Sequence, residues 1–459
     1  MIINEKEKLM ITEIKWNNHP VLGNLVLKLT KSDGTPYKTI VIAGENGTGK
    51  TTILETLSDF LNLNSIEVFE YIKYEINGEI YKIVPNSINP QLGFHKRTKE
   101  SDGSEITITS NKHNDRASID ADELDIRHYG CAYSKARSGF TTKPVKSTTT
   151  QQLDDDKYAE DKNEDFTLIK QLLVDIKTQD NSLLAKKFEK REITTPEEYA
   201  EISKMKRFKT AFDNFFENMS FDGVDDESPD EKKIVFMKQG NQISIDQLST
   251  GEKQIAFRGT YLLKNSNNLN GGVVLVDEPE LSMHPKWQAK IFDFYRGLFT
   301  ANGSQTAQMF FATHSENVIR SAVKDSEVLI IILSETNGVI TANKINEIVL
   351  PSLTAAEINY LAFGVKSVDY HIALYGDLQT QTGNAKIEDA DLYIAAQSEY
   401  DASIHGRADS YRRNHYQTLP TYIRNAIDHP DSGRRYTDEQ MEASIKLLRD
   451  ICKRLRTSP

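Results

Sequence analysis

Continuous apolar runs mark the places where this chain is expected to form buried strands. Such runs of β-branched and aromatic residues are typical of strands covered on both faces. Four of them occupy residues 39–43, 273–276, 309–312 and 328–333. Alternating apolar and polar residues over 9–45 and 66–134 predict further strands, and Asn77-Gly78 predicts a tight hairpin turn between two of them. The segment 127–134 predicts one more core strand.

Apolar residues three and four positions apart predict helices elsewhere in the chain. One helical pattern begins at Thr52, and another covers 166–220 with a break at Thr194-Thr195-Pro196. This second stretch predicts a compact helical lid inserted between strands. Strand patterns return at 233–237 and 243–245. The polar, Ser- and Thr-rich segment 135–150 predicts a mobile loop.

The region after residue 350 is expected to be helical, and its last helix has a clear start. Thr437 and Gln440 predict a capping box, and Tyr436 and Met441 a hydrophobic staple. One apolar face follows from the helical spacing of Met441, Ile445, Leu448, Cys452 and Leu455.

These patterns predict an α/β protein built from four parts. They are two halves of a core, a helical insertion between the halves, and a helical C-terminal region. In chain order the parts occupy residues 1–150, 151–235, 236–350 and 351–459.

Composition and charge narrow the class of protein. The chain has 459 residues, of which 38% are apolar and 27% charged, as expected for a globular protein. No apolar run approaches the length of a membrane span, and the first residues lack the pattern of a signal peptide. Two cysteines give no disulfide or zinc framework, so a cytoplasmic location is expected. The net charge of −11 argues against a protein that coats nucleic acid.

The acidic residues gather in two short segments. Residues 154–165 hold seven acids against two lysines, and residues 222–231 hold six acids and no base. Solvated loops are the simplest interpretation, and an acidic surface for a basic partner is the alternative.

The segment that follows the first buried run matches a phosphate-binding loop. Residues 44–51 fit the pattern G-x-x-x-x-G-K-[ST], between a predicted strand and a predicted helix. Its glycines allow backbone N–H groups to face a polyphosphate, and the helix start adds a positive dipole end. Lys50 would reach the β- and γ-phosphates, and Thr51 would bind Mg²⁺. The nucleotide-binding residues are expected to be Gly44, Glu45, Asn46, Gly47, Thr48, Gly49, Lys50, Thr51 and Thr52.

A pair of carboxylates follows the second buried run. Asp277 and Glu278 come directly after four apolar residues, which places them at the carboxyl edge of the predicted sheet. Asp277 suits the coordination shell of Mg²⁺. Glu278 is placed to polarise an attacking water as general base. A core strand that ends in two solvated acids is the structural alternative.

Two further segments give the chain a resemblance to ABC-type ATPases. Leu248-Ser249-Thr250-Gly251-Glu252 resembles the family's LSGGQ signature, and His314, after the third buried run, resembles its switch histidine. The resemblance implies an ATP-hydrolysing P-loop core with a mixed sheet. It also implies that the signature of one protomer caps the γ-phosphate held by another, in an ATP sandwich. The resemblance therefore assigns Ser249, Thr250, Gly251 and Glu252 to the nucleotide and His314 to catalysis.

The segment Glu280-Leu281-Ser282-Met283-His284-Pro285 narrows the family. It resembles the E-x-x-x-H-P segment of RecF-like and OLD-like ATPases of the AAA_21 group, which implies that Ser282 and His284 lie near the contact between protomers. The structural alternative is that Pro285 opens a helix in its first turn. The family also carries a Q-loop glutamine, for which Gln91, Gln151 and Gln152 are candidates.

The C-terminal region resembles the tail of ATPases from bacterial anti-phage systems of the Septu and retron type, over residues 355–379 and 419–430. This resemblance implies an oligomeric regulatory ATPase that controls a separate HNH-type nuclease. Contact with nucleic acid would then be indirect, through that nuclease. No HNH pattern occurs in this chain.

Two alternatives remain open at this stage. Arg424 and His429 match R-x4-H, a pattern that resembles the ribonuclease site of HEPN domains, so the chain could cleave RNA itself. Residues 407–459 carry 11 Lys and Arg against 7 Asp and Glu, which is compatible with RNA and equally with an acidic protein partner. The structural interpretation is that His429, before Pro430, ends a helix. The other alternative is a DNA-repair ATPase of the RecF type, against which the acidic charge argues.

Overall fold

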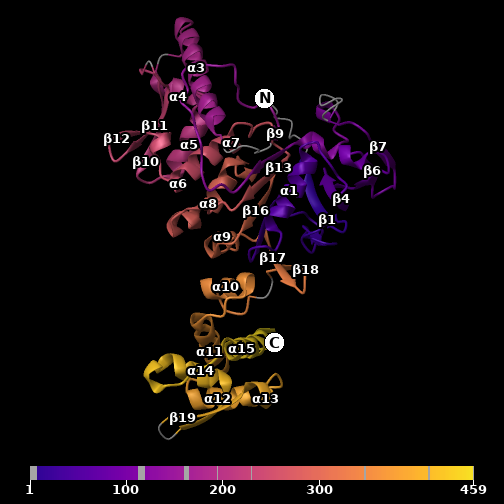
Figure 1. The fold of residues 1–459 in the computed structure, drawn as a ribbon, viewed down its shortest axis with the longest axis vertical. Helices are drawn as coiled ribbons and strands as arrows, with labels where there is room; N and C mark the ends of the chain where they lie inside the picture. The colour runs from indigo at the N-terminus through magenta and orange to yellow at the C-terminus, as the bar shows by residue number, and fades with distance from the viewer. Residues whose placement is uncertain are drawn as a thin grey trace. The chain divides into compact units, whose positions relative to one another are not determined.

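The computed structural model describes residues 8–111, 119–159, 165–193, 195–228, 230–345, 348–411 and 414–457. The chain divides into two compact units, Met1–Asn343 and Lys344–Pro459 (Figure 1). Each unit has its own buried core. Among the described residues, no helix has the length and apolar character needed to cross a bilayer.

A seven-stranded sheet forms the centre of the first unit. Its strand order is β18-β17-β3-β16-β13-β8-β9, and the pairings from β17 to β9 are all parallel. The bounds are β3 Thr39–Gly44, β8 Cys131–Ser134, β9 Tyr158–Ala159, β13 Val273–Asp277, β16 Gln308–Thr313, β17 Val328–Thr336 and β18 Val339–Lys344. The four continuous apolar runs are thus confirmed as strands. Because these strands are parallel, the residues that follow them lie at one edge of the sheet.

A second, antiparallel sheet packs in the same unit. Its order is β2-β1-β4-β5-β6-β7, with bounds β1 Met10–Trp16, β2 Val26–Lys28, β4 Phe69–Ile76, β5 Glu79–Pro85, β6 His95–Lys99 and β7 Glu105–Ile108. The predicted hairpin turn is present, with φ of 52° at Asn77 and 80° at Gly78. Helix α1 (Lys50–Leu61) shares one apolar cluster with both sheets, through residues such as Phe60, Phe69 and Phe310.

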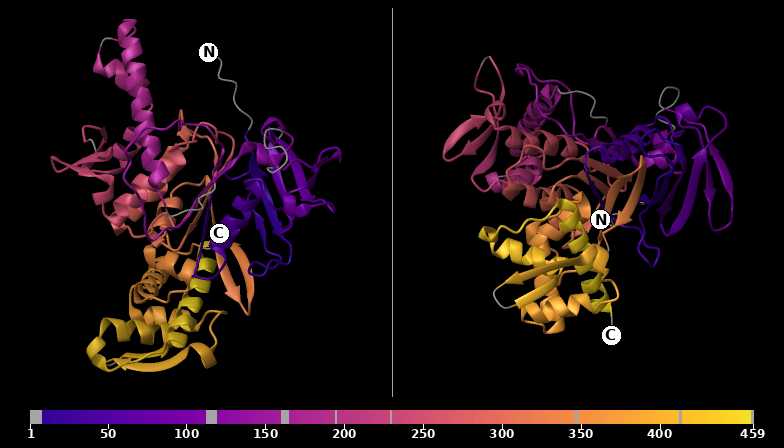
Figure 2. Two further views of the ribbon diagram at one scale, coloured as in Figure 1. Left: turned by 45° about the horizontal axis from the view of Figure 1, so that its top comes forward. Right: turned by 60° about the horizontal axis from the view of Figure 1, so that its bottom comes forward.

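The insertion contains helices, as expected, and also a sheet. Helices α3 (Thr167–Glu189), α4 (Pro196–Ile202) and α5 (Lys206–Phe215) are followed by the antiparallel strands β10 (Met219–Asp225), β11 (Lys233–Lys238) and β12 (Asn241–Ser244). Figure 2 shows α3 extending away from the central sheet. Strand β10 corrects the expectation of a purely helical lid. It forms because Met219 and Phe221 alternate with polar residues, and Phe221 packs against Phe212 of α5.

One local expectation beside β8 is partly wrong. Residues 126–129 form a 3₁₀ turn rather than a strand, because the Asp125 carboxylate accepts hydrogen bonds from the Arg127 N–H and guanidinium. The segment 135–150 lacks helix and strand, as predicted for a loop, and two of its residues form hydrogen bonds with other elements. Thr142 donates to Asp246, and the Thr149 N–H donates to Asp175, at 2.6 and 2.7 Å.

The remaining helices of the first unit lie between the late strands. A short helix α6 (Thr250–Lys253), a π-helical turn (Gln254–Arg258) and α7 (Gly259–Leu263) follow β12. Helix α8 (Pro285–Leu298) begins as the structural alternative predicts, with Pro285 in its first turn and the His284 side chain accepting from the Lys286 N–H. Helix α9 (Glu316–Ala322) follows β16, and the pair β14 (Thr300–Ala301) and β15 (Ser304–Gln305) forms a small hairpin.

The second unit is mainly helical. Its elements are α10 Ala355–Phe363, α11 Val368–Thr382, α12 Ile387–Ala395, α13 Ala402–His405, β19 Gly406–Tyr411, β20 Asn414–Thr418, α14 Leu419–Asp428 and α15 Asp438–Thr457. The capping box is present, with hydrogen bonds of 3.1 and 3.3 Å between Thr437 and Gln440. The predicted apolar face of α15 lies in the core. The hairpin β19–β20 was not expected, because its sequence is too polar to show alternation.

Polar side chains are buried in the core of the second unit. Glu357 accepts from Tyr370, and Arg449 contacts both of them. The His371 ring lies 2.8 Å from the Ser444 hydroxyl through Nε2, and neither residue is exposed. Burial lowers the pKa of His371 from its ordinary 6.5 to about 3, because the charged ring would lose its hydration.

We expect the second unit to lose stability as the pH falls below about 6.5, through the titration of His371. The unfolded chain takes up a proton there that the folded chain does not, at about 1.4 kcal/mol per pH unit. His371→Gln keeps a hydrogen-bonding group beside Ser444 and removes the titration, so its melting temperature should fall less between pH 7 and pH 5. Calorimetry of the whole chain measures this. His415→Gln, at an exposed position of the same unit, is the control. Equal pH dependence in the wild type and His371→Gln would contradict the assignment.

Candidate functional site

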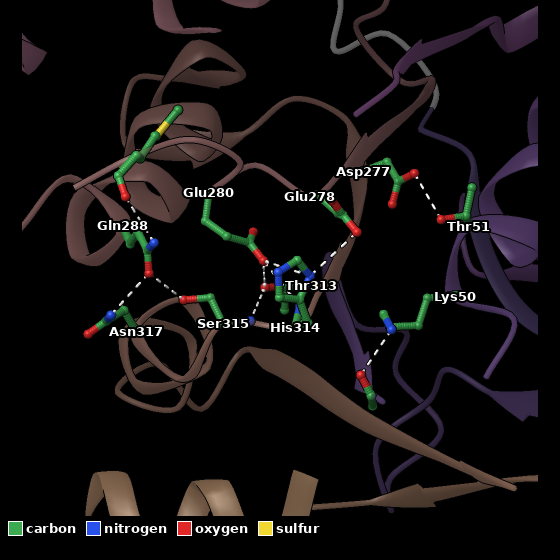
Figure 3. Close-up of polar contacts among 12 residues, drawn as sticks. Lys50, Thr51, Asp277, Glu278, Glu280, Gln288, Thr313, His314, Ser315 and Asn317 are labelled. Carbon is green, nitrogen blue, oxygen red and sulfur yellow. Dashed lines mark hydrogen bonds and ion pairs between the residues drawn. The ribbon is translucent and has the colours of Figure 1, made fainter. Parts of the chain in front are cut away.

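The parallel strands bring the predicted site residues to one edge of the central sheet. The phosphate-binding loop follows β3, the two carboxylates end β13, and His314 follows β16. Strand β16 pairs with both β3 and β13. Three segments that are far apart in sequence therefore meet at one place (Figure 3).

The loop after β3 has the tight backbone that its glycines predict. Gly44 has φ of 148°, and a Cβ there would lie 2.4 Å from the Leu333 carbonyl oxygen. Gly49 has φ of 87°, and a Cβ there would lie 2.5 Å from the Leu22 side chain. Between them, Glu45, Asn46 and Gly47 are exposed. Larger residues at Gly44 or Gly49 would displace the loop from its neighbours.

Lys50 closes the loop on itself. Its Nζ donates to the carbonyls of Gly44 and Glu45, at 2.9 and 2.8 Å. Burial lowers the pKa of Lys50, and the carboxylates of Glu278, Asp277 and Glu280 act in the opposite direction. A bound phosphate would replace the two carbonyls as acceptor. Thr48 stiffens the same turn by donating to the Glu45 carbonyl at 2.8 Å, and Thr52 lies in the first turn of α1.

The Thr51 hydroxyl and the Asp277 carboxylate lie next to each other at this edge. The Thr51 hydroxyl donates to Asp277 Oδ2 at 3.0 Å, and the Tyr133 hydroxyl lies 3.4 Å from the same oxygen. Asp277 Oδ1 is buried without a hydrogen-bond partner in the described part of the chain. Burial raises the pKa of Asp277 to about 6. An orphaned carboxylate oxygen beside a hydroxyl fits a hard cation that takes one or two protein ligands.

Glu278 and His314 face one another. Glu278 Oε1 lies 3.4 Å from His314 Nδ1, and Figure 3 shows the contact. The hydrogen bond between them lowers the pKa of Glu278 and raises the pKa of His314. Glu278 has φ of 40°, which is unusual for a residue with a side chain. The charge of Lys50 also acts on the Glu278 carboxylate and helps to lower its pKa.

Sequence reasoning left Glu280 out of the site. Its side chain is 3% exposed, and Oε1 accepts from the Thr313 hydroxyl and the His314 N–H, at 2.7 and 3.1 Å. This carboxylate therefore fixes the backbone that carries His314. The sequence signal that could have identified Glu280 is its position in Asp-Glu-Pro-Glu, two residues after Glu278. Gln288 adds a second set of ties, since it accepts from Ser315 and Asn317 and donates to the Met283 carbonyl.

The signature segment forms a capped helix start. The Ser249 hydroxyl and N–H both donate to Glu252 Oε2 at 2.8 Å, and Lys238 donates to the other Glu252 oxygen. Burial opposes the charge of Glu252, but the hydrogen bonds from Lys238 and Ser249 hold its pKa below the ordinary value. A Cβ at Gly251 would lie 2.9 Å from the Ser282 carbonyl oxygen. The helix of Thr250 and Gly251 thus packs closely on the segment 280–285.

The three Q-loop candidates lie outside the strands of the central sheet. Gln91 is in a 3₁₀ turn at 90–92, and the Gln151 carbonyl accepts from Gln179 of α3. Gln152 follows it in the same irregular segment. The residue that ends β8 is Ser134. The choice among the three glutamines stays open.

Arg424 and His429 lie in the second unit, at the end of α14. Arg424 forms an ion pair of 2.5 Å with Asp428 and donates to the Asn425 side chain. His429 caps α14 as the residue directly after it, and its N–H donates to the Asn425 carbonyl. The R-x4-H match is therefore divided between a helical residue and the residue after the helix.

Comparison with known proteins identifies a family and includes the following relatives. A family model described as AAA domain, putative AbiEii toxin, Type IV TA system matches residues 40–320. The retron Vc95 probable ATPase of Vibrio cholerae serotype O1 biovar El Tor is 35% identical over 101 residues, which are 20% of this chain and 19% of that protein. Septu protein PtuA of Bacillus thuringiensis is 25% identical over 332 residues, which are 68% of this chain and 74% of PtuA.

Solved structures of SMC heads also align with the chain at low TM-scores. An SMC head bound to the C-winged helix domain of ScpA covers 73% of this chain and 97% of its own, at 15% identity and a TM-score of 0.39. The SMC head domain from Thermotoga maritima covers 73% and 99%, at 13% identity and a TM-score of 0.37.

The family model spans more than half of the chain, and it includes the phosphate-binding loop, the signature, both carboxylates and His314. The relatives named above include a probable ATPase of a retron and a Septu protein. The chain therefore belongs to the AAA_21 family and is a P-loop ATPase associated with bacterial defence systems.

Proposed function

We propose that this protein is a regulatory ATPase that controls a partner nuclease through ATP-dependent assembly of its own protomers. The observation that carries the proposal is the meeting of Lys50, the Thr51–Asp277 pair and the Glu278–His314 pair at one sheet edge. Together they supply a phosphate cradle, a cation site and a general base, the set that phosphoryl transfer to water requires.

Each side chain has a distinct role in the proposed hydrolysis. Lys50 and the loop N–H groups would bind the phosphates. Glu278 would accept a proton from the attacking water, and His314 would hold the Glu278 carboxylate and contact the γ-phosphate. Thr51 and Asp277 would hold Mg²⁺, which would offset the charge of the β- and γ-phosphates.

The assembly step rests on the signature segment. Ser249 and the N–H groups of Thr250 and Gly251 would cap the γ-phosphate bound by another protomer, while Glu252 stabilises the start of their helix. A homo-oligomer based on such a dimer would form with ATP and dissociate after hydrolysis. The relation to ATPases of ABC type supports this arrangement.

The control of a nuclease is supported by the relation to Septu protein PtuA, which aligns over 74% of its length. We propose an HNH-type nuclease as the partner and residues 351–459 as its docking region. Nucleic acid would be reached through that nuclease, in the cytoplasm. The division of the first unit into residues 1–150, 151–235 and 236–350 belongs to the same proposal.

Lys50→Ala is expected to weaken ATP binding by roughly tenfold to a hundredfold. A hydrogen bond to a charged group contributes about 1.5–3 kcal/mol, and Lys50 is the cation that ends the loop. Titration with a fluorescent ATP analogue measures the change. Lys31→Ala is the control, since Lys31 pairs with Glu327 at the surface of the same unit. Unchanged affinity in Lys50→Ala would refute the assignment of the loop.

Glu278→Gln should bind ATP with normal affinity and hydrolyse it at least about a hundredfold more slowly. The amide keeps the shape of the side chain but takes no proton from water. The variant should also accumulate the ATP-bound assembly, which light scattering detects as an increase in mass. Glu327→Gln serves as the control at an exposed carboxylate. Turnover at the wild-type rate would place the base elsewhere.

Arg424→Ala and His429→Ala should leave ATP turnover within about twofold of wild type, because both residues lie in the second unit. A pull-down with a candidate HNH-type nuclease, an RNA-cleavage gel and a melting curve then separate the remaining interpretations. Loss of nuclease binding alone supports docking by this region. Loss of RNA cleavage by the pure chain supports the ribonuclease alternative. Early melting shows a structural role, consistent with the Arg424–Asp428 ion pair.

A further inference from the structure

Arg258 is a buried cation that none of the roles above uses. It ends the π-helical turn Gln254–Arg258, which joins the signature helix α6 to α7. Its side chain is among the largest that are fully buried, with the residue 1% exposed. Turns of π-helix are rare and frequently occur at functional sites. A guanidinium in such a position needs partners for its five N–H donors.

The partners of Arg258 lie at the ends of two neighbouring strands. Its Nη2 donates to the carbonyls of Asp277 and Ser134, at 2.6 and 3.0 Å. Its Nη1 donates to the Glu278 carbonyl at 3.1 Å, and its Nε donates to the Ser134 hydroxyl at 2.8 Å. Nη1 also lies 3.5 Å from Gln254 Oε1. The guanidinium of Arg258 thus connects the π-helical turn after the signature helix to the ends of β8 and β13.

These contacts hold the peptide that presents the general base. The carbonyls of Asp277 and Glu278 flank the Glu278 Cα, and the Glu278 N–H donates to the Ala312 carbonyl of β16 at 2.8 Å. The strained φ of Glu278 is therefore maintained from both sides. A displacement of the π-helical turn would move Arg258, and with it two of the three hydrogen bonds that fix the backbone of Glu278. Small errors in the position of a general base reduce the rate of reaction strongly.

We propose that Arg258 is a positioning residue that couples the signature segment 248–252 to Glu278 within one chain. When the signature caps a nucleotide, the turn at 254–258 transmits its position to the backbone of Glu278. Hydrolysis in a protomer then depends on whether its own signature is engaged. The inference rests on the proposed function, because it requires an ATPase whose signature contacts a nucleotide.

Arg258→Lys tests the proposal, because the lysine keeps the charge and lacks the fork that joins three carbonyls. We expect ATP affinity within about twofold of wild type and a fall in kcat of roughly tenfold to a hundredfold. Arg127→Lys is the matched control. Arg127 is fully buried in the same unit and bonds Asp125 and the carbonyls of Leu92 and Ser110, away from the site. The Arg127→Lys variant should lose about as much thermal stability as Arg258→Lys, and it should keep the kcat of the wild type.

A double variant separates positioning from general damage. If Arg258 acts through Glu278, Arg258→Lys should cause little further loss when added to Glu278→Gln in single-turnover assays. Additive losses, or a kcat in Arg258→Lys equal to that of Arg127→Lys, would overturn the proposal. If Arg258→Lys fails to fold, Ser134→Ala takes its place in the test. It removes the hydroxyl that accepts from Arg258 Nε and keeps Arg258, so it should give a smaller fall in kcat. Failure of the wild type to hydrolyse ATP would instead refute the proposed function.

Discussion

The balance between two buried cations, Lys50 and Arg258, and three carboxylates governs the sheet edge at which the site lies. Lys50 has Asp277, Glu278 and Glu280 as its charged neighbours, and two of these acids are almost fully buried. Buried charges are costly unless they are paired or hydrogen-bonded. The structure meets this cost in three ways: Thr51 donates to Asp277, His314 faces Glu278, and Thr313 donates to Glu280. A nucleotide that brings four negative charges here needs a divalent cation to enter.

Much of the fold and of this site could be predicted because the signals are local. A buried strand needs a continuous apolar run, and a phosphate-binding loop needs glycine where φ is positive. Residues 39–51 contain both signals within a few positions, and residues 273–276 contain the first, directly before Asp277 and Glu278. In a parallel sheet the carboxyl ends of the strands lie at the same edge. Lys50, Asp277 and His314 could therefore be placed together without knowledge of the side-chain contacts.

The parts that could not be predicted depend on contacts between distant residues. In the sequence, Arg258 looks like an ordinary residue of a helix. Only the folded structure shows that its side chain contacts Ser134 and Glu278. The acidic segment 222–231 was interpreted as solvated, yet Glu231 lies 3.5 Å from the buried amine of Lys170. That lysine also pairs with Asp246, two residues before the signature. The helical insertion is thereby tied to the signature segment through an ion pair that no local pattern shows.

The hydrogen bond from Ser249 to Glu252 limits how much the signature can contribute to the association of protomers. Its hydroxyl already donates to a carboxylate of its own helix, so contact with a phosphate would exchange one anionic acceptor for another. Lys238 offsets the Glu252 charge that would otherwise repel the incoming phosphate. The net number of hydrogen bonds changes little in such an exchange. The terminal phosphate would then decide which protomers pair, while most of the energy that keeps them together would come from the surrounding surfaces.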